Sequence, residues 1–338
     1  MTDLAPKRSL LRRLPVIHQL RQSVGLQRGM LVAGLVITGL FVLTALLAPV
    51  LAPYRYNQLR GADGTAFGAQ QPPSAEHLLG TTVGGYDVLS RVIWGSQTAL
   101  FVIVVAVILS IFIGVLLGLI SGYIGGWLDR VLVVVADAVY AFPSLLLAIV
   151  AAIVISRGQS SLVGGVFAAA ISITVVFIPQ YFRVIRAEAI RIKTEPFVES
   201  AKVMGASTGR IMFRHVLRNS TRTLPLIFTL NSSEAILVLA GLGFLGFGIE
   251  PTAAAEWGYD LNRSISDVTS GIWWTSIFPG SAIVLVVLGV TLIGESLNDL
   301  ADPRLRTRRR ADDTPAPTAA SSAVLAGSDS ADSLERGA

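Results

Sequence analysis

The residues with the clearest potential for chemistry are polar side chains inside long apolar segments. Asp137, Asn231 and Glu234 are of this kind. An ionisable group inside a bilayer costs free energy, so it usually faces a helix-bundle interior or water. Asn231 and Glu234 share a helix face at i and i+3, and Asp137 precedes Pro143, which is able to kink a helix. We expect the three to line a pathway, with Glu234 meeting an amino group of a transported molecule. The alternative is that Glu234 pairs with a partner subunit or stays protonated.

A second candidate is the segment VESAKVMGAS, Val198–Ser207, a polar interruption set among arginines. Pro196 is tolerated in a first helical turn, Thr194 is the expected N-cap, and Gly205 is expected to end the helix. The residues at i, i+4 and i+7 on one helix face are Phe197, Ala201 and Met204, with Glu199 and Lys202 elsewhere. The apolar side of a second short helix consists of Ile211, Met212, His215 and Val216. Two explanations fit this pattern. The element docks into a groove on a cytoplasmic partner, or it is an amphipathic linker that lies on a membrane surface.

Catalytic chemistry is excluded by what the sequence lacks. The chain has no cysteine, which rules out disulfides, thiolate metal sites and cysteine nucleophiles. His18, His77 and His215 are too scattered for metal-ligand spacing. No G-x-x-x-x-G-K-[ST] phosphate loop and no G-x-S-x-G elbow occurs. We therefore expect a protein that is not an enzyme and holds no cofactor or metal, so that a partner must supply the energy for any work.

The elements that position these residues are membrane helices. Of the 338 residues, 52% are hydrophobic and 14% charged, a balance typical of membrane proteins. A helix needs about 20 apolar residues to cross a hydrocarbon core, and a lone segment in lipid must be helical to satisfy its backbone. The six runs that qualify are Met30–Val50, Ala99–Ser121, Val131–Ile155, Leu162–Phe182, Leu224–Gly248 and Trp274–Leu297. The predicted fold class is an all-α integral membrane protein with six transmembrane helices.

The distribution of charge predicts the orientation. With the N-terminus inside, the cytoplasmic segments hold 22 of the 27 Lys and Arg residues, as the positive-inside rule requires. Both termini are then cytoplasmic, and so is the loop between the fourth and fifth spans. Three parts follow: a cytoplasmic segment 1–28, a transmembrane domain 29–300, and a tail 301–338 whose polar composition predicts disorder.

Six sequence segments resemble one family. Glu199-Ser200-Ala201 followed by Gly205 is similar to the Glu-Ala-Ala…Gly loop of permease subunits of bacterial ABC importers. The other five segments are HLLGTTVGGYDVLSR (77–91), GLISGYIGGWLD (118–129), DAVYAFPSLLLA (137–148), RIMFRHVLRN (210–219) and AGLGFLGFGIEP (240–251). Together they resemble the C-type permease of dipeptide and oligopeptide importers over residues 28–300.

This resemblance implies a function and a set of partners. The chain would be a multi-pass protein of the bacterial inner membrane that forms half of a pore with a homologous B-type permease. Two cytoplasmic ATPases, which hold ATP and Mg, would dock on a coupling loop at about residues 188–218, and an extracytoplasmic binding protein would deliver substrate. Nucleic acid is not among the expected partners. The expected substrates are short peptides, with nickel chelates, glutathione or haem as alternatives within the family.

The chain departs from the family at a few positions. Ser200 replaces the middle Ala of the loop, and Arg218 stands where a Pro usually closes the motif. Thr82 and Tyr86 stand where relatives usually carry Asp and Arg, and Leu239 replaces an acid. Two hypotheses from other classes remain. One is a secondary transporter with Asp137 and Glu234 as ion-coupling carboxylates, and the other is a membrane scaffold without transport.

Overall fold

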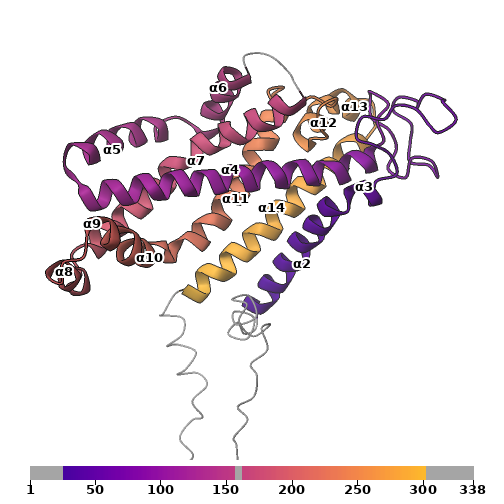
Figure 1. The fold of residues 1–338 in the computed structure, drawn as a ribbon. Helices are drawn as coiled ribbons and strands as arrows, with labels where there is room; N and C mark the ends of the chain where they lie inside the picture. The colour runs from indigo at the N-terminus through magenta and orange to yellow at the C-terminus, as the bar shows by residue number, and fades with distance from the viewer. Residues whose placement is uncertain (1–25, 157–161, 302–338) are drawn as a thin grey trace, which may run out of the picture. The chain divides into compact units, whose positions relative to one another are not determined.

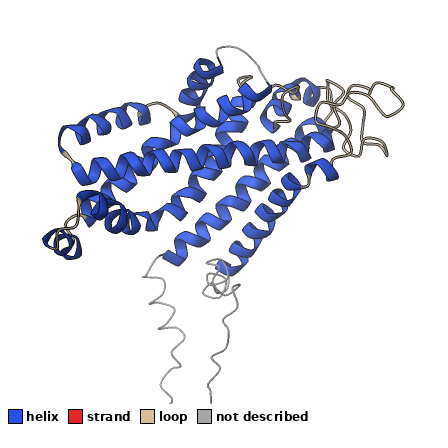
Figure 2. Ribbon diagram, viewed as in Figure 1, coloured by secondary structure: helices blue, strands red, loops and turns tan. Residues whose placement is uncertain are grey.

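The computed structural model describes residues 26–156 and 162–301, and within them every extended element is a helix (Figures 1 and 2). The only bridges of β type in these residues pair Arg60 with Ala66 and Thr81 with Asp87. The long helices are α2 (Leu26–Leu46), α4 (Val88–Ile124), α5 (Gly126–Tyr140), α6 (Ser144–Ser156), α7 (Leu162–Ile192), α11 (Leu224–Phe244) and α14 (Trp274–Ala301). The short ones are α3 (Ala48–Leu51), α8 (Pro196–Val203), α9 (Thr208–Arg210), a π-helical turn (Ile211–Val216), α10 (Leu217–Ser220), a 3₁₀ turn (Thr221–Thr223), α12 (Trp257–Arg263) and α13 (Ile265–Thr269).

Five of these helices are long and apolar enough to cross a membrane: α2, α4, α7, α11 and α14. Helices α5 and α6 together make a sixth candidate, but they are bent by 99° at the break between them. The prediction of an all-α membrane protein is therefore confirmed, and the predicted span over 131–155 is divided at Pro143, the residue that was expected to kink it. Pro143 explains the break because it has no N–H to donate and its ring clashes with the preceding turn. The predicted segment 1–28 and tail 301–338 lie almost wholly outside the described residues.

Helices α4 and α7 pack closely along a stripe of small residues. A Cβ added at Gly114 would meet Tyr181 Cβ at 2.6 Å, and one added at Gly118 would meet the carbonyl oxygen of Phe182 at 2.6 Å. Small residues allow this close approach, which supplies much of the packing energy between helices in lipid. The main core continues from this contact into α6, α11 and α14.

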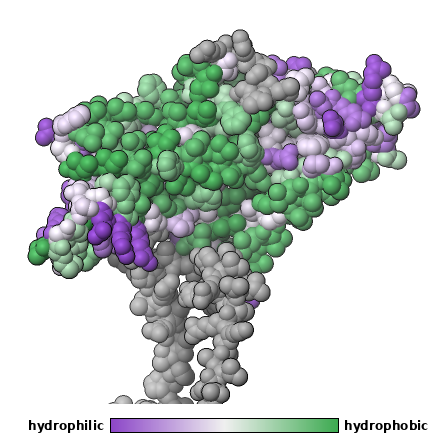
Figure 3. Space-filling model, viewed as in Figure 1, coloured by the Kyte–Doolittle hydropathy of each residue, from purple (hydrophilic) through white to green (hydrophobic). Residues whose placement is uncertain are grey.

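The two ends of α4 define the two ends of the bundle. Its first turns contact the segment 52–87 and α12, and its last turns contact the π-helical turn, on which α8 packs. We call these the α12 end and the α8 end. A helix of 37 residues is about 55 Å long at 1.5 Å per residue. Figure 3 shows an apolar surface over the helices between the two ends, with hydrophilic surface gathered at each.

Candidate functional site

The loop between α7 and α11 holds α8 in a defined position. Glu195, not Thr194, is the N-cap residue, and Pro196 follows it. The helix ends in a Schellman motif, because Ala206 N–H donates to Ala201 O and Gly205 N–H donates to Lys202 O, with φ at Gly205 of +78°. The prediction that Gly205 ends this helix is confirmed. The predicted N-cap Thr194 is wrong by one residue, because the Thr194 hydroxyl donates to Arg191 O instead.

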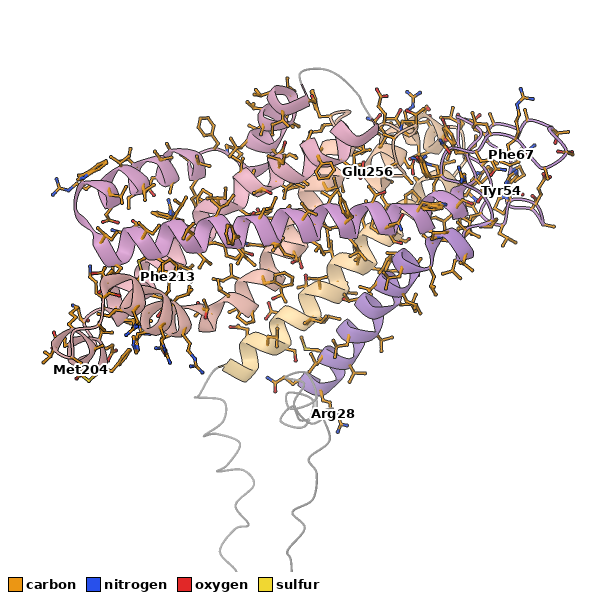
Figure 4. All side chains as sticks on the ribbon, viewed as in Figure 1. Arg28, Tyr54, Phe67, Met204, Phe213 and Glu256 are labelled. Carbon is orange, nitrogen blue, oxygen red and sulfur yellow. The ribbon has the colours of Figure 1, made fainter. Side chains whose placement is uncertain are left out.

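The predicted docking face of α8 is divided by the structure. Ala201 is only 4% exposed and packs with Val198 against the π-helical turn and the ends of α4 and α7. The expectation that Ala201 is free to meet a partner is therefore wrong, because α8 uses this side to pack on its own chain. Phe197 and Met204 remain 44% and 80% exposed, and Val203, which the sequence analysis did not select, is 88% exposed. Figure 4 shows Met204 at the far tip of this loop.

The three pathway candidates do not come together. Glu234 lines a cleft of about 180 Å³ beside the α5–α6 break, which we call the α5–α6 cleft. Its other lining residues are Val139, Tyr140, Phe142, Ser144, Leu147, Val176, Phe177 and Gln180. Glu234 makes no hydrogen bond or ion pair with another described residue. Of the residues predicted from sequence, Glu234 alone faces this cleft, and Gln180 and Tyr140 were not predicted.

Asn231 and Asp137 have other surroundings. Asn231 is buried within the bundle, and its side-chain nitrogen has no hydrogen-bond partner among the described residues. The carboxylate of Asp137 forms an ion pair with Arg183 at 2.7 Å, and that guanidinium lies 4.3 Å from the ring centre of Tyr140. Asp137 is not among the residues that line the α5–α6 cleft, and it already has a counter-ion on α7. Arg183 directly follows the apolar run of the predicted fourth span, and no local sequence pattern marks it as the partner of Asp137.

The α12 end contains buried charged groups. Arg91 donates from Nε to both oxygens of Asp260, at 2.7 and 2.8 Å, and both side chains are almost inaccessible. His77 and Asp87 form a second buried pair at 2.9 Å. Glu256, labelled in Figure 4, caps α12 by accepting from the N–H groups of Gly258 and Tyr259. Burial raises the pKa of Glu256 to about 8, although these two hydrogen bonds oppose the shift.

A second cleft, of about 170 Å³, opens at the same end, and we call it the α12 cleft. Thr82 and Tyr86, two of the positions that depart from the family pattern, both line it. Of the other departures, Leu239 is buried in the core, and Arg218 is exposed on α10. Within residues 26–156 and 162–301, no three His, Asp or Glu side chains are grouped as a metal site would require.

Comparison with known proteins assigns the family. Residues 114–307 match the family described as the binding-protein-dependent transport system inner membrane component. The chain belongs to this family. Residues 26–73 match the N-terminal transmembrane domain of oligopeptide transport permease C. As an ABC transport permease, the chain is a multi-pass inner-membrane subunit and not a catalytic one, and the resemblance noted in the sequence is confirmed.

Relatives of this permease cover most of its length. It is 38% identical to the dipeptide transport system permease protein DppC of Alkalihalophilus pseudofirmus over 276 residues, which are 82% of this chain and 86% of the relative. It is 32% identical to the glutathione transport system permease protein GsiD of Pectobacterium atrosepticum over 288 residues, 85% of this chain and 89% of the relative. For GsiD of Shigella flexneri the identity is 36% over 267 residues, 79% and 84% of the two chains.

Proposed function

We propose that this permease forms half of the translocation pore of an ATP-driven importer of short peptides, and that α8 couples it to cytoplasmic ATPases. The observation that carries the coupling role is the exposed apolar tip of α8. Val203 and Met204 project from a helix whose other side is fixed by Val198 and Ala201. A tip of this kind, held on a packed base, is suited to insertion into a groove on another protein.

The surroundings of α8 favour a protein partner over lipid. Its exposed neighbours include Lys202, Arg210 and Arg214, and Figure 3 shows strongly hydrophilic surface on the same loop. Fully burying a Val or Met side chain contributes about 1.5–3 kcal/mol, so covering both would contribute several kcal/mol to docking. The distribution of Lys and Arg supports a cytoplasmic position for this loop and both termini, on the side where ATPases act.

The α5–α6 cleft supports a role for Glu234 in the pathway. A broken helix within a membrane commonly marks a substrate site, because irregular backbone at that depth must face protein or water. Here the cleft lies at such a break and contains a carboxylate without a partner among the described residues. A peptide amino group is a suitable counter-ion for Glu234. A homologous B-type permease facing this cleft would complete the pore, and a binding protein would deliver the peptide.

The proposed substrate class follows from the relatives. Relatives of this chain carry names that specify dipeptide and glutathione transport. Glutathione is itself a peptide with a free amino group, so a carboxylate at Glu234 suits both. Short peptides are our first proposal and glutathione the second. Nothing described in the chain favours nickel chelates or haem over these.

Cysteine cross-linking tests the coupling role. Because the chain has no cysteine, an introduced thiol is the only one it offers, and a disulfide closes only when two α-carbons approach within about 7 Å. We expect Met204→Cys and Val203→Cys to cross-link with cysteines placed in the ATPase groove. Ala201→Cys is the matched control on the same helix and should not react, because Ala201 is buried. Equal cross-linking at 201 and 204, or none at 203 and 204, would reject the docking of α8.

Uptake of a labelled dipeptide tests the pathway. Glu234→Gln should lower uptake at least tenfold while the cross-link at Met204→Cys persists, since the amide keeps the shape but loses the charge. Loss of the cross-link in Glu234→Gln would instead show that Glu234 holds the subunits together.

A further inference from the structure

The α12 cleft contains a buried carboxylate that the transport role of α8 and Glu234 does not use. Asp267 is 0% exposed and lines this cleft. Its Oδ1 accepts a hydrogen bond of 2.6 Å from the side chain of Gln70, while its Oδ2 is buried and has no partner among the described residues. Burial of a carboxylate is costly unless it is paired and hydrogen-bonded. Asp267 therefore favours a cation as a ligand.

The backbone of Gln70 supports a functional position for Asp267. Gln70 has φ of +56°, and no other non-glycine residue in the described part of the chain has a positive φ. This conformation costs a side-chain-bearing residue free energy, and such strain is concentrated at functional sites. The strained residue is the one that orients the Asp267 carboxylate. It connects the segment 52–87 to α13 across 197 positions of sequence.

The other charged groups at the cleft define the kind of cation. Asp260 also lines the cleft, but the buried Arg91 already neutralises it. Arg263 lines the same cleft, is exposed, and makes no ion pair with a described residue. The cleft thus presents one carboxylate and one guanidinium, each without a counter-ion within the described chain. A ligand that carries both an ammonium and a carboxylate would satisfy both.

We propose that the α12 cleft is a subsite for a small zwitterion, a free amino acid or a short peptide, with its ammonium group at Asp267 and its carboxylate at Arg263. This inference rests on the proposed function only for the choice of peptides as ligands. The α12 cleft has a volume of about 170 Å³, which suits an amino acid or one end of a dipeptide. The site lies at the opposite end of α4 from α8, and it shares no lining residue with the α5–α6 cleft.

A single cysteine in the cleft provides the test. Thr82 lines the cleft and is half-buried, so Thr82→Cys should be reachable. The full chain is assembled with its partner subunits in nanodiscs without ATP and is treated with a cationic or an anionic methanethiosulfonate reagent. The rate at which the introduced thiol is modified is followed by the increase in the mass of this chain. Nanodiscs expose both membrane faces, so the result does not depend on orientation or on transport.

The expected results are specific to charge. Asp267→Asn should lower the ratio of cationic to anionic rates about tenfold, and Arg263→Gln should raise it. Asp63→Asn is the matched control and should leave the ratio unchanged, because Asp63 is an exposed acid of the segment 52–87 that does not line the cleft. Asp267→Glu, which keeps the charge, should also preserve it, which separates loss of charge from misfolding.

Protection by ligand completes the test. Dialanine should slow modification of Thr82→Cys, whereas N-acetyl-dialanine and dialanine amide, which each lack one charge, should protect at least fivefold less well. Protection should be lost in Asp267→Asn. An unchanged rate ratio in Asp267→Asn, no protection by dialanine, or equal protection by the blocked peptides would each overturn the proposal. Those outcomes would leave the cross-linking at α8 and the Glu234 uptake test unaffected, so failure of this site is distinguishable from failure of the transport role.

Discussion

Gly118→Ala should destabilise the permease, because the stripe between α4 and α7 leaves no room for a methyl group at this position. The added Cβ would lie 2.6 Å from the carbonyl oxygen of Phe182, 3.1 Å from the backbone nitrogen of Arg186 and 3.2 Å from Ile185 Cβ. The first two are backbone atoms, so no flexible side chain can yield and the helices must separate. Overpacking of this kind costs about 1–3 kcal/mol. The higher helix propensity of Ala relative to Gly offsets about 0.5–1 kcal/mol of this cost, which leaves a net loss of up to about 2.5 kcal/mol.

The assay is thermal unfolding of the purified permease in detergent, with Gly39→Ala as the matched control. Gly39 also lies inside a helix, α2, but a Cβ there would meet no atom within 4 Å. Each kcal/mol corresponds to about 2–4 °C for a chain of this order of size. We therefore expect Gly118→Ala to lower the apparent Tm by up to about 10 °C and Gly39→Ala to leave it unchanged or raise it slightly. Equal Tm values for the two variants would refute the close-packing argument.

Three further predictions concern other parts of the chain. Glu256 has a folded pKa of about 8, above its unfolded value, so its contribution to stability is complete below about pH 4.5 and is lost as the pH rises through about 8. Glu256→Gln should make proteolysis of the 245–273 segment less dependent on pH between 5 and 8.5, and an unchanged profile would contradict this. Exchanging the charges of Asp137 and Arg183 in one double variant should restore uptake that each single reversal lowers, because the pair is local; failure of the double variant would show that one of them has another partner. Ala201→Leu should detach α8 and abolish cross-linking at 204, whereas the exposed Ser200→Leu should not.

Much of the architecture could be predicted because membrane helices are specified locally. A span can be identified from the length and apolar composition of a segment, because a helix in lipid forms its backbone hydrogen bonds within that segment. The break between α5 and α6 was harder, since Pro143 indicates a kink but not a bend of 99°. The angle depends on what each half packs against, and periodicity does not contain that information.

The functional residues show the same division. Helical spacing predicts that Phe197, Ala201 and Met204 lie on one face of a helix. Spacing alone does not show which face of the helix packs against the rest of the chain. Ala201 packs with Val198 at i and i+3, a pattern equally visible in the sequence. The pairs Arg91–Asp260 and Gln70–Asp267 join residues 169 and 197 positions apart. Long-range pairs of this kind come from the folded topology and leave no local signal.

The 37-residue α4 has a mechanical consequence. It contains no proline, and three of its four glycines, Gly114, Gly118 and Gly122, pack against α7, while Gly95 lies against Trp257 of α12. The two helices together therefore behave as a stiff beam about 55 Å long. A rotation of about 5° around one end of a beam of this length moves the other end by about 5 Å. If a closing partner displaces α8 and turns this beam about its middle, the α12 end moves by a similar distance in the opposite direction. The beam would then act as a lever, and its length sets how far each end moves for a given rotation.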